Sequence, residues 1–160
     1  QSKGKAAFLE ANNLDGLSVE QIVAKLEHET SEEPNMYAAI TATKLILGDD
    51  YNQYNLNIPS DKFYLSIAPY INMTHPCGNH NLITCRGELQ NKMMHIIVKD
   101  YKGNIIVDDD FTSYNNGFIG VWLPSNIKGT ITISYNGLSA TTDINTSSRS
   151  NTCLTTMKLG

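Results

Sequence analysis

The stretch "GTITISYNGLSATTDI", residues 129–144, gives the clearest indication of fold in the chain. Two runs in which apolar and small polar residues alternate lie on either side of Asn136-Gly137. Alternation with a period of two is typical of a strand that buries one face. Asn-Gly between such runs is the strongest short-range indication of a β-hairpin. We therefore predict a hairpin here.

Similar runs occur elsewhere, each bounded by turn residues. "MMHIIVKD" (93–100) and "NIIVDDDF" (104–111) flank Tyr101-Lys102-Gly103 and predict a second hairpin. Strands at intervals of about 8–12 residues are typical of a sandwich or a small barrel. The other predicted strands are "TKLIL" (43–47), "YNLNI" (54–58), "KFYLSIA" (62–68), "GFIGVWLP" (117–124) and "TCLTTMKL" (152–159).

Helical patterns gather at the N-terminus. In "LSVEQIVAKLEH" (17–28), Ser18 and Gln21 have the spacing of a capping box, and apolar residues then recur with the helical period. This pattern predicts a helix over residues 19–29. We also expect shorter helices in "KAAFLEAN" (5–12) and in "PNMYAAI" (34–40), where the proline would lie in the first turn.

These patterns predict an α+β protein with a short N-terminal helical segment and a predominantly antiparallel β-sandwich or small barrel domain. We place the helical segment at residues 1–58 and the β-rich domain at residues 59–160. The apolar face of the helical segment has to be buried, either against the chain's own sheet or against a second copy. We expect a homodimer.

Composition narrows the function. The net charge of −4 argues against non-specific binding to nucleic acid, which needs a basic face. No apolar run approaches the ~18 residues of a membrane span. The abundance of Asn, Thr, Ser and Tyr is more typical of an envelope or secreted protein than of a cytosolic enzyme. Motifs of hydrolytic sites and phosphate-binding loops are absent from the sequence.

A second stretch, "NMTHPCGNHNLITCRG" (72–87), contains two of the three cysteines, Cys77 and Cys85, together with His75 and His80. The third cysteine, Cys153, begins the last predicted strand. Thiolates select soft ions such as Cu(I), whereas imidazole suits Cu(II) and Zn(II) equally. The spacing contains no CxxC motif and does not match a zinc finger.

The residues alone leave three interpretations open. Cys77 and Cys85 could form a structural disulfide while Cys153 stays buried and inert. The cysteines could instead hold a soft metal, with His75 and His80 as ligands or as groups that orient a ligand. Two neighbouring thiols could also exchange with a disulfide, which requires another protein to reopen the bond.

Other polar residues have simpler interpretations. His28 ends a predicted helix, where a cation favours the helix dipole, so a structural role is expected. His95 lies in a strand and should pair with a neighbour or pack at the edge of the core. Glu88 either stabilises a turn, orients a histidine or pairs with Arg86. The run Asp108 to Asp110 should be a solvated strand end, since no EF-hand spacing surrounds it.

Several long segments resemble the CueP family of bacterial envelope copper-binding proteins. The resemblance spans most of the chain and includes the block in which "THPC", "GNHNLITC" and "RGEL" follow one another. The segments are "LDGLSVEQIVAKL" (14–26), "FYLSIAPYINMTHPCGNHNLITCRGEL" (63–89), "NNGFIGVWLP" (115–124) and "TCLTTM" (152–157).

The resemblance implies a periplasmic or cell-envelope protein that sequesters copper, mainly as Cu(I), and contributes to copper resistance. Matched by motif, the copper site falls on Cys77, Cys85 and Cys153, with His75 and His80 as further candidate ligands. The implied partners are a copper-dependent enzyme such as Cu,Zn superoxide dismutase, which would receive the ion, and periplasmic disulfide-reducing proteins. An N-terminal dimerising segment before a β-rich domain is also implied.

Three functional hypotheses follow. The first is a copper-binding protein that buffers and delivers Cu(I), with Cu(II) or a surrogate zinc ion as other occupants of the site. The second is a reductase, in which the same cysteines act as redox thiols on Cu(II) or Fe(III) and cycle through a disulfide. The third is a secreted β module whose cysteines serve only as a structural disulfide.

Overall fold

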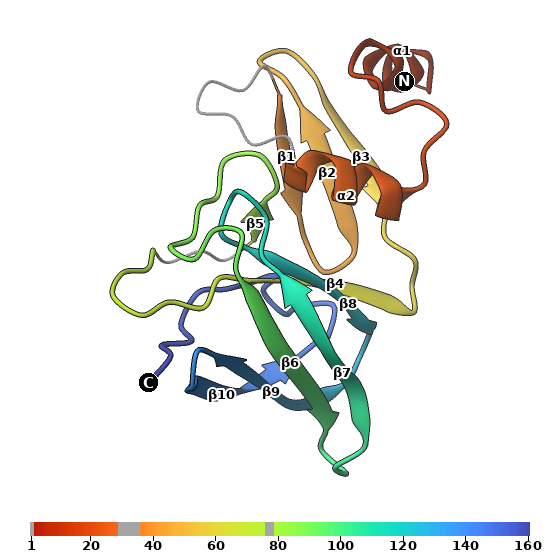
Figure 1. Cartoon of the computed structure of the whole chain (residues 1–160). Coiled ribbons are helices and arrows are strands. Elements are labelled where there is room, and N and C mark those ends of the chain that lie inside the picture. Colours follow the sequence, from red (N-terminus) through yellow and green to blue (C-terminus); the bar gives the residue numbers. More distant parts are fainter. Residues whose placement is uncertain (1, 29–35, 76–78) are drawn as a thin grey trace.

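The computed structural model describes residues 2–28, 36–75 and 79–160. Within these residues, two helices and three β-sheets are arranged in layers, with the helices at one end of the molecule (Figure 1). The strands are mostly antiparallel, which confirms the predicted α+β class. Of the predicted alternatives, the sandwich is the better description, because none of the sheets closes into a barrel within the described residues.

The helices are α1 (Ser2–Ala11) and α2 (Val19–His28). The capping box before α2 is confirmed: the Gln21 amide donates to Ser18 Oγ (3.2 Å), and the Ser18 amide donates to Gln21 Oε1 (2.9 Å). α1 packs against strand β3 (Gln53–Asn57), where the centroid of the Phe8 ring lies 5.1 Å from that of the Tyr54 ring.

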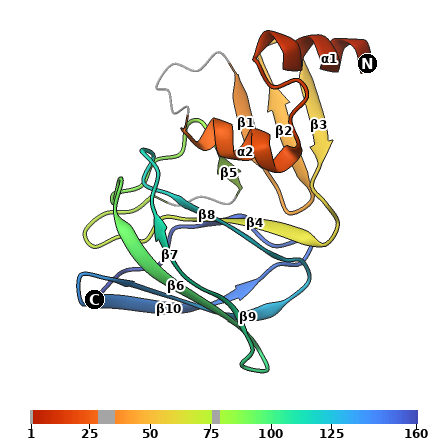
Figure 2. The same cartoon turned by 45° about the vertical axis from the view of Figure 1, so that its right-hand side comes forward.

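The upper sheet has the order β3 (Gln53–Asn57), β2 (Lys44–Gly48), β1 (Tyr37–Ile40) and β5 (His80–Asn81), and α2 lies across its face (Figure 2). The helix predicted over residues 34–40 is therefore wrong from Tyr37 onward. Ala38 and Ile40 alternate with half-buried neighbours, and every residue of β1 pairs with β2. This strand pairing outweighs a weak local helical pattern. Pro34 and Asn35 lie outside the described residues.

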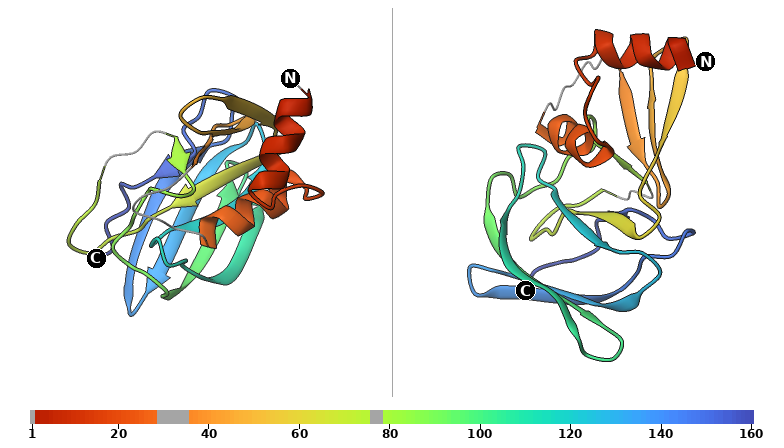
Figure 3. Two further views of the ribbon diagram at one scale, coloured as in Figure 1. Left: turned by 90° about the horizontal axis from the view of Figure 1, so that it is seen from above. Right: turned by 90° about the vertical axis from the view of Figure 1, so that its right-hand side faces the viewer.

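The middle sheet is buried on both faces, because it lies between two hydrophobic cores. Its order is β11 (Cys153–Leu154), β4 (Lys62–Ile67) and β8 (Ile119–Pro124), and β11 runs parallel to β4. Phe63 and Leu65 pack into the lower core, whereas Tyr64 and Trp122 pack into the upper core with α2. Successive side chains of a strand point to opposite faces, so this one sheet separates two cores (Figure 3, right).

The lower sheet contains both predicted hairpins. Its order is β10 (Leu138–Asn145), β9 (Lys128–Tyr135), β6 (Met93–Asp100) and β7 (Ile105–Thr112). Asn136 and Gly137 have φ values of 50° and 77°, as a type I′ turn requires. The last predicted strand is shorter than expected: after β11, a single bridge joins Lys158 to Tyr70.

The apolar face of α2 is buried within its own chain. Ile22, Val23 and Leu26 are each about 1% exposed and pack with the upper sheet. The expected homodimer therefore stays a prediction without support from this helix. The boundary after residue 58 also stays a prediction; Leu82 and Ile83 join the same upper core. Neither helix of the described chain has the length and apolar character needed to cross a membrane.

Candidate metal centre

Cys153 and Cys85 lie at one small apolar cluster at the end of the middle sheet. Cys153 begins β11 and pairs with Ser66 of β4, and it packs with Ala68 and Phe118. Cys85 is half-buried and packs against the same cluster. Two cysteines from distant parts of the sequence thus lie at one apolar cluster.

A tight turn after β5 places Cys85. The Asn81 side chain accepts hydrogen bonds from the amides of Ile83 (3.0 Å) and Thr84 (3.1 Å). The Cys85 amide donates to the Asn81 carbonyl (3.2 Å), and Cys85 Sγ accepts from the Asn81 amide (3.3 Å). An Asx turn of this kind favours Asn at its first position. It directs the thiol back toward β5, which carries His80.

His80 is fully buried next to this cluster. Its ring packs against Phe118 with centroids 4.4 Å apart, and its amide donates to Thr152 Oγ1 (3.0 Å). The Thr152 hydroxyl donates in turn to the Ile40 carbonyl (2.6 Å). Strand β1 of the upper sheet, β5 and the residue before Cys153 therefore hold one another in place.

His75 lies on the exposed side of the same region. It lines a small hollow with Ala68, which also belongs to the apolar cluster. The neighbouring Thr74 hydroxyl donates to the Thr155 carbonyl (2.6 Å), and this bond ties the segment before Cys77 to the segment after Cys153. His75 is thus close to the cluster but in contact with solvent.

The predicted ligand Cys77 lies outside the described residues. Among the residues that the structure does describe, no three His, Cys, Asp or Glu side chains come close enough together to hold an ion. The soft donors at the apolar cluster are the sulfurs of Cys85 and Cys153, and the buried imidazole of His80 packs against Phe118 of the same cluster. This set fits a soft d¹⁰ ion such as Cu(I) and does not fit a hard cation, which needs oxygen ligands.

Sequence reasoning missed Glu27, which is fully buried in the last turn of α2. Its carboxylate accepts hydrogen bonds from His80 Nε2 (3.0 and 3.2 Å), from Asn116 Nδ2 (2.6 Å) and from the Tyr64 hydroxyl (3.0 Å). The spacing could have revealed it, because Glu27 follows Val23 by four residues and so falls on the apolar face of the helix.

The Glu27 carboxylate also affects the tyrosines beside it. Burial first, and then the negative charge of Glu27, raise the pKa of Tyr64 well above its ordinary value. The same two causes, in the same order, raise the pKa of Tyr114. Both phenols therefore stay protonated at neutral pH, and Tyr64 acts as a hydrogen-bond donor to the carboxylate.

The remaining candidates make structural contacts, and the run Asp108 to Asp110 lies within β7 rather than at a strand end. The His28 ring packs edge-on against Tyr114, with centroids 4.7 Å apart. The His95 ring nitrogens bond Asp110 (2.7 Å) and Asp108 (2.6 Å), both on exposed positions of β7. Glu88 stabilises a turn, since its carboxylate accepts from the amides of Ile71 (2.7 Å) and Asn72 (3.0 Å). These two bonds lower the pKa of Glu88.

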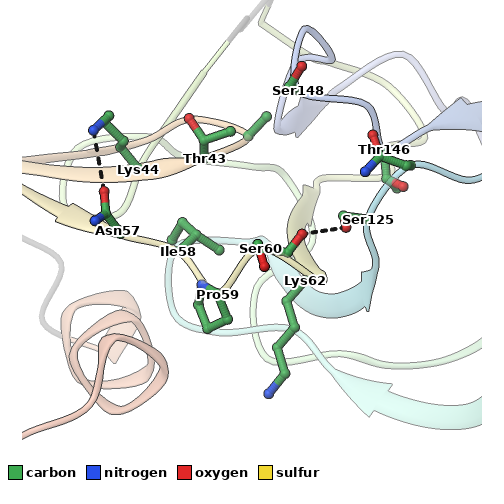
Figure 4. A pocket seen from close by; sticks show the side chains of 12 residues that line it. Thr43, Lys44, Asn57, Ile58, Pro59, Ser60, Lys62, Ser125, Thr146 and Ser148 are labelled. Carbon is green, nitrogen blue, oxygen red and sulfur yellow. Dashed lines mark hydrogen bonds between the residues drawn. The ribbon is translucent and has the colours of Figure 1, made fainter.

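A hollow beside the ends of β2 and β3 is unrelated to this chemistry (Figure 4). Its lining contains hydroxyl, amide and aliphatic side chains, with Lys44 and Lys62 at the rim, and includes neither cysteine nor histidine. In Figure 4 the Lys44 ammonium donates to Asn57 Oδ1 (3.3 Å), and the Ser125 hydroxyl donates to the Ser60 carbonyl (2.7 Å). Such a lining offers no soft ligand.

The chain is similar to known proteins in both sequence and fold. The model of the family "Periplasmic copper-binding protein CueP" matches residues 21–158. A crystal structure of S.CueP is 48% identical in sequence and superposes with a TM-score of 0.94 over 98% of this chain and 97% of that one. The search of curated proteins found no match.

Proposed function

Because the chain belongs to the CueP family of periplasmic copper-binding proteins, we propose that it binds copper as Cu(I) through the sulfurs of Cys85 and Cys153. Cys77 supplies the third thiolate of the proposed site. The chain thereby sequesters copper in the periplasm. The resulting complex would then deliver Cu(I) to a copper enzyme such as Cu,Zn superoxide dismutase.

One observation carries the proposal: Cys85 packs against the apolar cluster that contains Cys153, although the two residues are far apart in the sequence. Thiolates prefer soft ions, and few ligands suffice for Cu(I). Apolar neighbours such as Phe118 bury Cys153, and the lower local dielectric strengthens the attraction between its thiolate and a cation.

The histidines complete the proposal. His80 is the buried candidate ligand, and His75 is the exposed one. Imidazole also accepts Cu(II) and zinc, so the same site would take Cu(II) on arrival and zinc as a surrogate. Association into a homodimer stays part of the proposal, and so do partners that reduce disulfides.

Anaerobic titration of the reduced protein with Cu(I), in competition with a chromogenic chelator, tests the binding. Cys85→Ser and Cys153→Ser should each weaken Cu(I) binding at least tenfold, and Cys77→Ser should do the same. His95→Gln is the matched control, because this histidine bonds only aspartates on the far sheet. Unchanged affinity in the triple Cys→Ser variant would refute the proposal.

A second function, reduction of Cu(II), is supported by the same proximity of Cys85 to Cys153. Two thiols would lose two protons and two electrons and form one S–S bond, while two Cu(II) ions become two Cu(I). A periplasmic dithiol protein would then reduce the disulfide. Mixing the reduced protein with Cu(II) should consume two thiols for every two Cu(I) formed. Cu(I) formation without thiol loss would exclude this function.

A purely structural role for the cysteines predicts a different result. In that case Cys153 would be an inert thiol, and the reduced protein would bind no Cu(I). Thiol labelling of the native, reduced protein in the presence and absence of Cu(I) separates these possibilities. We expect Cu(I) to protect Cys85 and Cys153 from labelling.

A further inference from the structure

The carboxylate of Glu27 is the least expected group near the candidate site. It comes from α2 and is fully buried, and its three donors come from β4, β5 and the loop before β8. Helix α2 therefore contacts the candidate metal centre through a charged group, although amphipathic helices usually present apolar side chains to a core.

Stability alone does not explain a carboxylate at this position. Taking an ionised group out of water costs several kcal/mol, and a buried ion pair is often no more stabilising than apolar residues of the same volume. The partners here satisfy the carboxylate oxygens well, with distances of 2.6–3.2 Å. Unlike an apolar residue, the carboxylate fixes the orientation of its neighbours, because it accepts hydrogen bonds only from donor groups that point toward it.

The direction matters for the His80 ring. A carboxylate has no proton to donate, so His80 Nε2 carries the hydrogen of the 3.0 Å bond to Glu27. A nitrogen that holds a proton cannot at the same time bind a metal. Any bond from His80 to a metal therefore has to come from Nδ1.

The rest of the ring is fixed as well. Phe118 covers one side of the imidazole at 4.4 Å, and the His80 amide is bonded to Thr152, the residue before Cys153. Phe118 also belongs to the apolar cluster against which Cys85 packs. The ring is thus bonded to Glu27 through Nε2 and packed against Phe118, a member of the cysteine cluster.

We propose that Glu27 is a positioning residue for copper binding, which holds His80 with Nε2–H toward its carboxylate so that Nδ1 is the nitrogen presented to Cu(I). This inference rests on the proposed function and adds a role in copper binding for helix α2, which carries Glu27. Carboxylate groups that orient a ligating histidine raise its basicity and fix its tautomer, and their loss typically lowers metal affinity about 10- to 100-fold.

Two measurements on the unmodified protein come first. Long-range ¹H–¹⁵N spectra of the reduced, metal-free chain should show the His80 proton on Nε2. Addition of one equivalent of Cu(I) without oxygen should shift the Nδ1 resonance while the Nε2 proton remains. A proton found on Nδ1 alone, or an Nδ1 resonance that Cu(I) does not move, overturns the proposal even if every variant fails to fold.

Three variants separate positioning from stability. Glu27→Gln leaves one acceptor oxygen for three donors, so the Nε2–H tautomer should be lost in part and Cu(I) affinity should fall about 10- to 100-fold. Tyr64→Phe removes another donor to the same carboxylate, which should lower stability and leave the tautomer unchanged. Glu20→Gln removes a half-buried carboxylate of the same helix, paired with Lys62 at 2.8 Å, and should change affinity less than twofold.

The outcomes distinguish this inference from the proposed function. A folded Glu27→Gln variant that binds Cu(I) as tightly as the parent overturns the role of Glu27 while copper binding by the cysteines stands. A parent that binds Cu(I) no better than its triple Cys→Ser variant refutes the proposed function. In that case an Nε2–H tautomer would show that Glu27 orients His80 for structural reasons only. The proposed role of Glu27 in copper binding would then be refuted together with the proposed function.

Discussion

A glycine pair allows the loop with Asn116 and Phe118 to approach the segment after Cys85. Gly117 has a φ of +80°, and a Cβ atom there would collide with the backbone of Gly87. The Gly87 amide donates to the Asn116 carbonyl at 2.6 Å, so the two segments cross in direct backbone contact. This crossing places Phe118 against His80 and Cys153.

Replacing Gly117 with alanine should therefore destabilise the protein for two reasons. A positive φ costs a non-glycine residue about 1–2 kcal/mol, and forcing the backbones apart adds about 1–3 kcal/mol. Gly103→Ala is the matched control, because its φ is +86° but nothing lies within 4 Å of the added Cβ. Urea unfolding should show a clearly larger loss for Gly117→Ala; equal losses would mean that the crossing tolerates a methyl group.

His95 should make the stability of the lower sheet depend on pH. The carboxylate of Asp110, and then that of Asp108, raise the pKa of His95 above its ordinary value of about 6.5. A raised pKa in the folded state means that the cation is bound more tightly there. The stabilisation is complete below the ordinary histidine pKa and is lost as the pH rises through the raised one. The free energies of unfolding of the parent and of His95→Gln should therefore differ below the ordinary histidine pKa. They should become equal above the raised pKa.

An NMR titration of His95 checks the cause of this effect. Asp110→Asn should lower the pKa of His95. Asp109→Asn is the control, because Asp109 lies in the same run and bonds the Asp110 amide rather than the ring. A pKa of His95 that is unchanged in Asp110→Asn would show that the carboxylate bond has no influence on the imidazole.

At the scale of elements, the capping box of α2 supports the helix that carries Glu27. Ser18→Ala removes the acceptor of the Gln21 amide and should lower the free energy of unfolding by about 1 kcal/mol. Ser18→Gly is the control, since glycine at an N-cap costs only a few tenths of a kcal/mol. Urea unfolding measures both. Equal losses would indicate that the hydroxyl does not cap the helix.

Elements with a local cause were predictable from the sequence. Asn136-Gly137 needs no partner to favour its turn, and the capping box of Ser18 and Gln21 defines the start of α2. β1 was misread because its four residues become a strand through pairing with β2. The last strand ends early for a related reason, since only Cys153 and Leu154 pair with β4.

The candidate site was predictable in part. Cys85, Cys153 and His80 were proposed from their ligand chemistry and a family pattern. The structure places Cys85 against the cluster that contains Cys153, and the His80 ring against Phe118 of that cluster. Glu27 was missed because its role depends on donors from three other elements, and their convergence is a property of the tertiary structure. Glu88, which the sequence offered as a group that orients a histidine, bonds two backbone amides instead.

At the scale of the whole molecule, the shared middle sheet should make both halves unfold together. Phe63 of β4 faces the lower core, and its neighbour Tyr64 faces the upper core. Neither core can open without exposing one face of the same strands. The bond from the Thr152 hydroxyl to the Ile40 carbonyl also links the segment before β11 to β1 of the upper sheet.

A substitution in one core should therefore accelerate amide hydrogen exchange in the other core as well. Phe63→Ala removes a ring that is 1% exposed in the lower core and should cost about 3–5 kcal/mol. The amide of Leu47 in the upper sheet should then exchange faster by the same factor as that of Ile131 in the lower sheet, because both open in one cooperative step. Tyr101→Ala, at an exposed hairpin tip, should change neither rate. If Ile131 is accelerated and Leu47 is not, the middle sheet separates two independently unfolding units, and Glu27 could lose His80 without global unfolding.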